Sequence, residues 1–390
     1  MTELCDLCRH DALEPFYRPE RSTRDITVCL CRHCGLIQST PRADRAPRRA
    51  AAVSSGADWG NVRYGKGFRT KEAMNALSRH IDLAQDFEIL DVGSNRGSFA
   101  KALLAAAPNA FLTAIEPDER VSESCAGLSR TELTLARIED VPLESGRFDV
   151  IHSCHTIEHL AHPMAVLEDH WRALKPNGLL IIDAPNSAIL GADDIVEEWF
   201  IDKHLYHFSK RTLTRMIEAA GFVIVEGPDD RDNTNLLIVA RRIDNKIAHI
   251  AADPLEVAAA EGLLIAYQQT RAANLMALTA VAAEIGTLLP KRVAMWGAGR
   301  LFDSLVVHGG FKASRLAMLI DAHLKAHVGE RHGCALSAPD DLPEAEPGVV
   351  VVMSRGFAGE IAAHAKQLAP KAEVIFYSDL LARARTRMAA

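Results

Sequence analysis

Two pairs of closely spaced cysteines near the start of the chain constrain its folding more than any other sequence feature. Cys5 and Cys8 form one Cys-x-x-Cys pair, and Cys31 and Cys34 form a second pair after 22 intervening residues. Without a secretory signal, this spacing is typical of four thiolates that bind one tetrahedral zinc ion. Sulfur would fill all four positions, so the predicted zinc is structural. Cys29 is a spare thiol that could replace Cys31.

Length and charge narrow the classes of protein to which the chain can belong. Its 390 residues are enough for two or three cores, and 48% hydrophobic with 24% charged residues is the composition of a folded protein. The net charge of -7 gives no overall attraction to nucleic acid or to an anionic membrane. No apolar run approaches the roughly 18 to 20 residues of a membrane helix. We therefore expect a cytoplasmic protein with neither a membrane nor a nucleic-acid partner.

Strand-like apolar runs alternate with helix-like stretches in two parts of the chain, and this alternation predicts an α/β fold. Residues 1–40 offer few apolar side chains for a core, and the Arg- and Pro-rich residues 41–52 are predicted to form a linker or a solvated helix. The expected strands are 88–92, 110–115, 148–152, 178–183 and 236–241, then 292–296, 315–320, 349–353 and 373–377. The predicted domains are a zinc-binding module with its linker (1–50), an α/β core (51–245), a helical connector (246–289) and a Rossmann-like domain (290–390).

The first α/β part carries a glycine-containing turn between a strand and a helix. The segment Ile89–Phe99 places Gly93 and Gly97 in this turn, and Glu116 ends the next strand 25 positions after Asp91. Such a unit lets the backbone approach a ligand closely and offers a carboxylate to ribose hydroxyls. It predicts a nucleotide-like cofactor, with an ordinary tight turn as the alternative.

Three later segments, taken with this turn, resemble the class I S-adenosylmethionine-dependent methyltransferases. They are Arg147–Ser153, His155–Leu160 and Leu174–Ile182. More narrowly, the turn Gly93–Gly97, the four-cysteine module and the C-terminal α/β domain together look like the three-domain, zinc-containing sugar C-methyltransferases. Members of that family act on nucleotide-linked keto-deoxysugars. The resemblance implies a class I methyltransferase Rossmann-like core between a zinc module and a second Rossmann-like domain.

The same resemblance implies a cofactor, S-adenosylmethionine, and a set of residues around it. Its methionine part would contact Gly93, Ser94, Asn95 and Gly97, its ribose Glu116, its adenine Ile138 and Glu139, and its sulfonium region His155, with Asp91 beside this set. The implied partner is a small-molecule substrate, which the family resemblance suggests is a nucleotide-linked sugar.

The segment His204–Ser209 resembles the catalytic loop of the sugar C-methyltransferases, in which a histidine is the general base. This assigns the base to His204, with His207 as the nearest substitute. Lys203 stands where the family carries Glu, and a cation there would favour neutral His204. An O-methyltransferase acting on another small molecule and a catalytically silent binding or assembly protein with the same fold stay open as alternatives.

His155-x-x-Glu158-His159 also matches a pattern of inverted zinc proteases, which requires both histidines on one helix face. In a second interpretation, Glu158 and His159 hold a divalent ion near the substrate, as in some quinone O-methyltransferases that the segment resembles. In a third, His159 only packs against the next helix.

The C-terminal domain repeats the arrangement of strand, glycine turn and helix over Ala294–Phe302, and Asp321 ends its next strand. Phe302 occupies the third glycine position, which argues against a dinucleotide. In the resembled family this domain helps to hold the nucleotide-linked substrate, and Arg300 would suit a phosphate. A role in protein interaction is the alternative.

Overall fold

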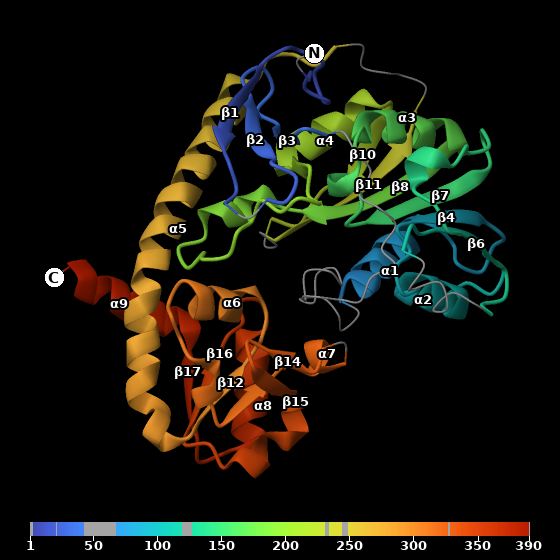
Figure 1. Ribbon diagram of the computed structural model, residues 1–390. Coiled ribbons are helices and arrows are strands. Elements are labelled where there is room, and N and C mark those ends of the chain that lie inside the picture. Colours follow the sequence, from blue (N-terminus) through green and yellow to red (C-terminus); the bar gives the residue numbers. More distant parts are fainter. Residues whose placement is uncertain are drawn as a thin grey trace. The chain divides into compact units, whose positions relative to one another are not determined.

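The computed structural model describes residues 3–20, 22–42, 68–118, 127–230, 234–243, 249–326 and 328–389 (Figure 1). Two compact units are distinguished. Within the described residues, the first contains the chain up to Arg42, residues 68–191 and Glu198–Ile265. The second contains Ala192–Glu197 and the part of the chain from Ala266 onward.

The first unit is built on a seven-stranded sheet of order β10-β11-β8-β7-β4-β5-β6. Its central strands are parallel, whereas β11 is antiparallel to both β8 and β10. The five strands predicted in this part are confirmed, and two edge strands, β6 and β10, were missed. The strands are β4 (Glu88–Val92), β5 (Phe111–Ile115), β6 (Thr131–Thr134), β7 (Phe148–Cys154), β8 (Leu174–Pro185), β10 (Phe222–Glu226) and β11 (Asn235–Arg242).

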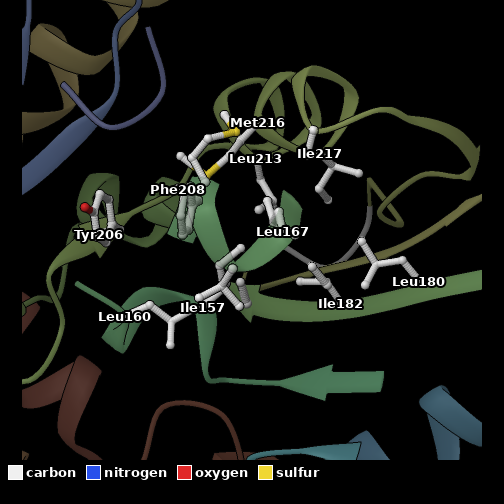
Figure 2. Close-up of a cluster of buried hydrophobic side chains, with 14 of the residues drawn as sticks. Ile157, Leu160, Leu167, Leu180, Ile182, Tyr206, Phe208, Leu213, Met216 and Ile217 are labelled. Carbon is white, nitrogen blue, oxygen red and sulfur yellow. The ribbon is translucent and has the colours of Figure 1, made fainter. Parts of the chain in front are cut away.

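Helices cover both faces of this sheet because successive strand residues point to opposite faces. Ile89 packs with α1 and α2 on one face, whereas Leu90 joins a core shared with α3 and α4 on the other. Figure 2 shows this second core, in which Leu213 and Met216 of α4 lie above the sheet. The helices are α1 (Phe68–His80), α2 (Ser98–Ala106), α3 (Pro163–Ala173) and α4 (Lys210–Ala219).

The cysteine-rich segment forms a small antiparallel sheet of order β1-β2-β3-β9. Its fourth strand comes from far along the chain, since Ile37 of β3 pairs with His207 of β9. The expectation that residues 1–40 lack a core was wrong, because Leu7 and Leu36 are buried in the core shared with α3 and α4. The strands are β1 (Leu13–Tyr17), β2 (Thr27–Cys31), β3 (Ile37–Thr40) and β9 (Tyr206–His207).

The linker predicted over residues 41–52 lies outside the described residues except for Pro41 and Arg42. Arg42 is not solvated, since its side chain is only 8% exposed.

The second unit is a doubly wound α/β domain with the sheet order β14-β15-β13-β12-β16-β17. All four predicted strands are confirmed, and the short hairpin β14-β15 was missed. The strands are β12 (Val293–Trp296), β13 (Met318–Ile320), β14 (Glu330–Arg331), β15 (Cys334–Ser337), β16 (Val349–Val352) and β17 (Glu373–Phe376). The helices are α6 (Arg300–Val307), α7 (Ala322–Lys325), α8 (Ala358–Leu368) and α9 (Tyr377–Ala389).

A short segment from the middle of the sequence, Ala192–Glu197, belongs to this second unit. Arg355, which follows β16, donates to Asp194 Oδ2 at 2.8 Å and to Glu197 Oε2 at 2.7 Å. The Asn274 amide donates to the carbonyl oxygens of Asp193 and Ile195, both at 2.9 Å. The segment is therefore fixed by ion pairs and by backbone hydrogen bonds.

The long Ala- and Leu-rich segment is a single helix, α5 (Pro254–Leu288). With the turn that follows it, this helix is long and apolar enough by composition to cross a membrane, contrary to the sequence expectation. However, several of its side chains, such as Leu264 and Leu278, are fully buried within the protein. The short 3-10 helices are η4 (Ile138–Asp140), η5 (Ile157–His159), η6 (Ser187–Gly191), η7 (Leu289–Lys291), η8 (Ala313–Arg315) and η9 (Pro339–Ala345).

A buried histidine in α3 should make the stability of the first unit depend on pH. Both ring nitrogens of His170 lack hydrogen-bond partners within the described structure, and burial lowers the pKa of His170 to about 4. Below pH 6.5 the unfolded chain binds a proton that the folded chain does not, so stability falls as the pH falls towards 4. Between pH 6.5 and pH 5 this histidine should lower the free energy of unfolding by about 2 kcal/mol, and His170→Leu should abolish that loss. Urea unfolding at both pH values measures this difference, and an identical pH dependence in both proteins would contradict it.

Candidate functional site

The four predicted metal-binding thiols lie together and are buried. The Sγ atoms of Cys5 and Cys34 are 3.6 Å apart, as are those of Cys8 and Cys31. All four sulfurs lie within 4.8 Å of one another. A tetrahedral ion with zinc–sulfur bonds of 2.3 Å requires sulfurs about 3.8 Å apart, so this donor set fits zinc. The spare Cys29 points elsewhere, towards Thr40 Oγ1 at 3.6 Å.

The glycine turn after β4 folds over the end of β5. The amides of Gly93 and Ser94 both donate to the Ile115 carbonyl, at 2.8 and 3.2 Å. Gly93 has φ +75°, and a Cβ there would lie 2.2 Å from Thr156 Oγ1, so glycine is required. Gly97, with φ +67°, then leads into α2.

Glu116 connects the glycine turn to the end of β5. Its Oε2 accepts from the Asn95 amide at 2.8 Å, and its Oε1 accepts from the Asp118 amide at 2.8 Å. Burial raises the pKa of Glu116, because desolvation disfavours the charged carboxylate. The side chain is thus held at the carboxyl ends of two adjacent parallel strands, where open α/β sheets bind ligands.

Asp91 lies beneath this turn and is almost fully buried. Its Oδ1 accepts from His152 Nδ1 at 2.7 Å, and its Oδ2 has no hydrogen-bond partner among the described residues. The Ser94 hydroxyl is likewise buried without such a partner. Two polar groups are therefore available to a ligand bound at the turn.

Ile138 and Glu139 lie in η4, which follows β6. Ile138 is buried, whereas Glu139 is exposed. The Ala161 amide donates to Glu139 Oε1 at 2.7 Å, and this bond fixes the carboxylate. The structure therefore links this loop to the segment after β7.

Histidines gather around one buried carboxylate after β7. Glu158 is 1% exposed, and neither of its oxygens has a hydrogen-bond partner within the described structure. Its Oε1 lies 3.4 Å from His155 Nδ1 and 3.7 Å from His159 Nε2. The His159 ring is 4.8 Å from that of His204, and ligand atoms of Glu158, His159 and His204 lie within 4.8 Å of one another. This trio has the composition of a divalent-cation site.

The two histidines that flank Glu158 are both oriented by hydrogen bonds. His155 Nε2 donates to Asn235 Oδ1 at 3.1 Å, and His159 Nδ1 donates to the Lys203 carbonyl at 2.7 Å. Burial lowers the pKa of both rings, that of His155 to about 3. The protease pattern is not met, since His155 precedes the single turn of η5 and does not share a helix face with His159.

His207 does not join this cluster. It is a buried residue of β9, and its ring packs edge-on against Phe200 with centroids 4.6 Å apart. Its Nε2 lies 3.4 Å from Ser39 Oγ, and burial lowers its pKa to about 3. The structure therefore gives His207 a packing role in the cysteine-module sheet.

Sequence reasoning missed two residues at this edge, Asp183 and Arg69. Asp183 lies near the end of β8, and its Oδ2 is 3.9 Å from Arg69 Nε of α1. The Cys154 thiol also donates to this carboxylate at 3.7 Å. Asp183 ended a predicted strand on the same edge as Asp91, which was an available signal. No sequence signal indicated Arg69, because a single Arg at the start of a helix is common and does not by itself mark a site.

The glycine turn of the second unit is hydrogen-bonded to Asp321, the acid that was predicted to end the next strand. The Ala298 amide donates to Asp321 Oδ2 at 3.0 Å. Gly297 has φ +114°, and a Cβ there would lie 2.5 Å from the Met353 carbonyl oxygen, so this turn packs tightly against the loop after β16. Phe302 is fully buried.

Comparison with known protein families finds a match for most of the first unit's large sheet. Residues 64–226 match the family model described as "Methyltransferase domain". The chain is 30% identical over 122 residues to the tRNA U34 carboxymethyltransferase of Desulfotalea psychrophila, covering 30% of this chain and 38% of that protein. It is 31% identical over 136 residues to the sarcosine/dimethylglycine N-methyltransferase of Halorhodospira halochloris, covering 33% and 46%. The chain thus spans less than half the length of these two relatives.

Among solved structures, an S-adenosylmethionine-dependent methyltransferase from Aquifex aeolicus aligns with a TM-score of 0.38 and 17% identity. The alignment covers 48% of this chain and 96% of that one. The sheet order and the glycine turn agree with the match of residues 64–226 to a methyltransferase domain.

Proposed function

We propose, from the premise that residues 64–226 form an S-adenosylmethionine-dependent methyltransferase domain, that the protein transfers a methyl group to a small-molecule acceptor. One observation carries the proposal. Glu116 is buried at the carboxyl end of β5, and the Asn95 amide of the glycine turn holds its carboxylate from β4. A carboxylate in this position can accept hydrogen bonds from two ribose hydroxyls.

The proposed cofactor site extends from this carboxylate in two directions. The turn Gly93–Gly97 would receive the methionine part, with Asp91 Oδ2 and Ser94 Oγ as unused polar atoms. On the other side, buried Ile138 would contact the adenine face, and the fixed carboxylate of Glu139 would accept from its amine.

For the acceptor we propose a carbon of a nucleotide-linked keto-deoxysugar, with His204 taking the proton. Bound S-adenosylmethionine supplies an electrophilic methyl group. His204 lies beside His159 at the edge of the histidine cluster, and a neutral imidazole can accept a proton near pH 7. His204 would take the proton from the acceptor carbon, and the electron pair left on that carbon would bond to the methyl group as the sulfur–methyl bond breaks and S-adenosylhomocysteine leaves. The chain's own contribution is alignment, exclusion of water and removal of this proton.

O-methylation is the second candidate, and one observation favours it. Glu158, His159 and His204 offer ligand atoms within 4.8 Å of one another. A divalent cation held there would lower the pKa of an acceptor hydroxyl, so that its proton could pass to water without a positioned general base. The two relatives described above are named for different acceptors, so they do not choose between carbon, oxygen and nitrogen.

We further propose that one structural zinc ion is bound by Cys5, Cys8, Cys31 and Cys34. Four buried sulfurs at nearly tetrahedral spacing support this proposal. Free thiols of this kind persist in a reducing compartment, so a cytoplasmic location is part of the proposal.

Calorimetric titration with S-adenosylhomocysteine, followed by transfer of a labelled methyl group into a cell extract, tests the function. We expect saturable binding and a labelled product, which mass spectrometry identifies. Binding without any labelled product from extracts that contain nucleotide sugars would favour a silent assembly protein. An absence of binding would overturn the proposal.

Glu116→Ala should weaken binding of S-adenosylhomocysteine at least tenfold. The substitution removes the acceptor for two hydroxyls and for the Asn95 amide, at a cost of about 2 to 3 kcal/mol. Glu132→Ala, which removes an exposed carboxylate of neighbouring β6, is the matched control and should leave the dissociation constant unchanged. Equal affinities for the two variants, with both folds intact by circular dichroism, would place the cofactor elsewhere.

A further inference from the structure

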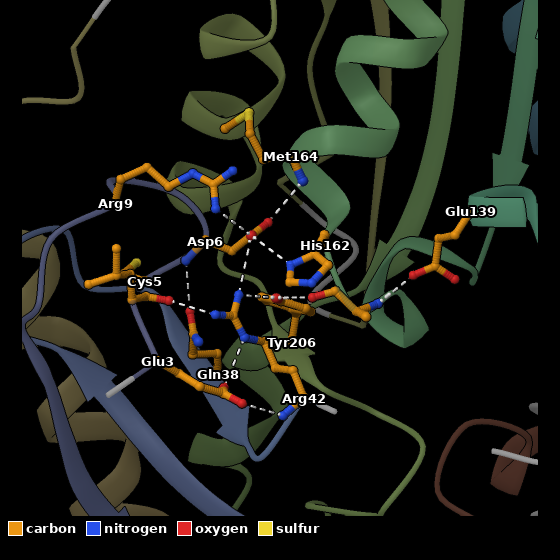
Figure 3. Close-up of polar contacts among 12 residues, drawn as sticks. Glu3, Cys5, Asp6, Arg9, Gln38, Arg42, Glu139, His162, Met164 and Tyr206 are labelled. Carbon is orange, nitrogen blue, oxygen red and sulfur yellow. Dashed lines mark hydrogen bonds and ion pairs between the residues drawn. The ribbon is translucent and has the colours of Figure 1, made fainter. Parts of the chain in front are cut away.

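Arg42 is a buried cation that joins the first residues of the cysteine module to Tyr206 of β9. Its Nε donates to Glu3 Oε2 at 3.0 Å, and its Nη2 donates to the Leu4 carbonyl at 2.8 Å. Its Nη1 donates to both Asp6 Oδ1 at 3.2 Å and the Tyr206 hydroxyl at 3.1 Å. Burial alone would lower the pKa of Arg42, but contacts with Tyr206, Glu3 and Asp6 raise it. The guanidinium is therefore charged and held by four neighbouring groups (Figure 3).

Asp6 lies between the paired cysteines Cys5 and Cys8 and is fully buried. While its Oδ1 accepts from Arg42, its Oδ2 accepts from the Met164 amide at 2.9 Å, in the first turn of α3. The N-cap residue of α3, His162, makes no side-chain capping bond of its own. The cysteine module thus supplies the cap for a helix of the methyltransferase domain.

From Arg42 the hydrogen bonds continue to the loop proposed to bind adenine. The Tyr206 hydroxyl, which accepts from Arg42, donates to the Ala161 carbonyl at 2.9 Å. The Ala161 amide donates to Glu139 Oε1 at 2.7 Å. Figure 3 shows the chain from Cys5 through Asp6, Arg42 and Tyr206 to Glu139. Apart from Glu139 and Ala161, its members are almost fully buried.

We propose that occupancy of the four-cysteine site and binding of the cofactor are thermodynamically coupled through Asp6, Arg42, Tyr206 and Ala161, with Arg42 and Tyr206 as positioning residues. The inference rests on the proposed function, because it takes zinc and S-adenosylmethionine as the two ligands. Metal bound to Cys5 and Cys8 fixes the backbone that carries Asp6, and Asp6 in turn orients Arg42 and Tyr206. Cofactor bound at Glu139 acts on the other end of the same chain.

Coupling of this kind must be reciprocal. If metal at the cysteines raises the affinity for the cofactor by some factor, then bound cofactor must raise the affinity for the metal by the same factor. Reciprocity allows the coupling to be read from the metal site of a folded, metal-loaded protein, without removing the metal beforehand and without measuring activity.

The experiment measures the dissociation constant of zinc by equilibrium competition with a chromogenic chelator, with and without saturating S-adenosylhomocysteine. We expect the ligand to lower this dissociation constant about fivefold or more in the unaltered protein. Tyr206→Phe keeps the buried ring and removes only the hydroxyl, so the ligand should change the dissociation constant of zinc less than about twofold. Tyr17→Phe is the matched control, because the Tyr17 hydroxyl donates to Glu198 and is outside the chain from Asp6 to Glu139. This control should behave like the unaltered protein.

Arg42→Lys gives a second measurement, since lysine cannot reach Asp6, Tyr206 and Leu4 together, and it should also reduce the effect of the ligand. An equal change in zinc affinity in all four proteins, or no change in the unaltered protein although it binds both ligands, would overturn the coupling. A protein that binds no S-adenosylhomocysteine or no zinc would instead refute the proposed function, so the two failures are distinguishable.

Discussion

His204→Ala is expected to lower turnover on the methyl acceptor by about 10² to 10⁴, the usual contribution of a positioned general base. Binding of S-adenosylhomocysteine should change little, because His204 is not among the residues that fix Glu116 or Glu139. Turnover is measured with the acceptor identified by label transfer, and binding is measured by calorimetry. His332→Ala, which alters an exposed hydrogen bond in the second unit, serves as the control.

A change in pH dependence would accompany the loss of a base. If His204 removes the proton, His204→Ala should abolish the rise in rate that deprotonation of the base produces. Full turnover in His204→Ala would mean that the base lies elsewhere or that the acceptor needs none. Carbon methylation would then lose its main support, and so would a cation site that needs His204 as a ligand beside Glu158 and His159.

Cys31→Ser is expected to abolish stoichiometric zinc binding and to unfold the cysteine module. Zinc contributes about 10 to 16 kcal/mol to such sites, more than the net stability of most domains. We expect zinc content to fall from one ion per chain to less than about a tenth, with new protease cleavage within residues 3–42.

Cys29→Ser is the matched control for this experiment. Cys29 is buried in the same strand, β2, but its thiol points towards Thr40 rather than the other sulfurs. It should lose a little stability and no zinc. Equal zinc content in the two variants would show that the four sulfurs do not form the metal site, and a zinc-free but protease-resistant module would show that apolar packing alone holds it.

Sequence predicted those parts of the molecule that depend on local chemistry. The strand Glu88–Val92 and its glycine turn were evident because an apolar run, two glycines and a following acid all lie within one unit of the chain. Strand β6, with the sequence TELT, was missed because it is a polar edge strand with no apolar signal.

The features that the sequence did not predict depend on contacts between residues far apart in the chain. His207 was predicted to be a possible base from its neighbours, but it pairs with Ile37 of β3, some 170 positions away, and packs within a sheet. Arg42 was predicted to be a linker residue because its partners, Asp6 and Tyr206, are far from it in the sequence and no local pattern indicates them. The positions of Glu158, His159 and His204 could be matched to motifs, but only the fold brings the third beside the other two.

The placement of Ala192–Glu197 bears on how this molecule could have been assembled from parts. A chain cut after residue 226 would carry Asp194 and Glu197 away from Arg355, leaving a part-buried guanidinium without its counter-ions in the other piece. The second unit is thus compact in space although it is discontinuous in sequence. Transfer of the C-terminal unit to another protein therefore requires transfer of this hexapeptide with it.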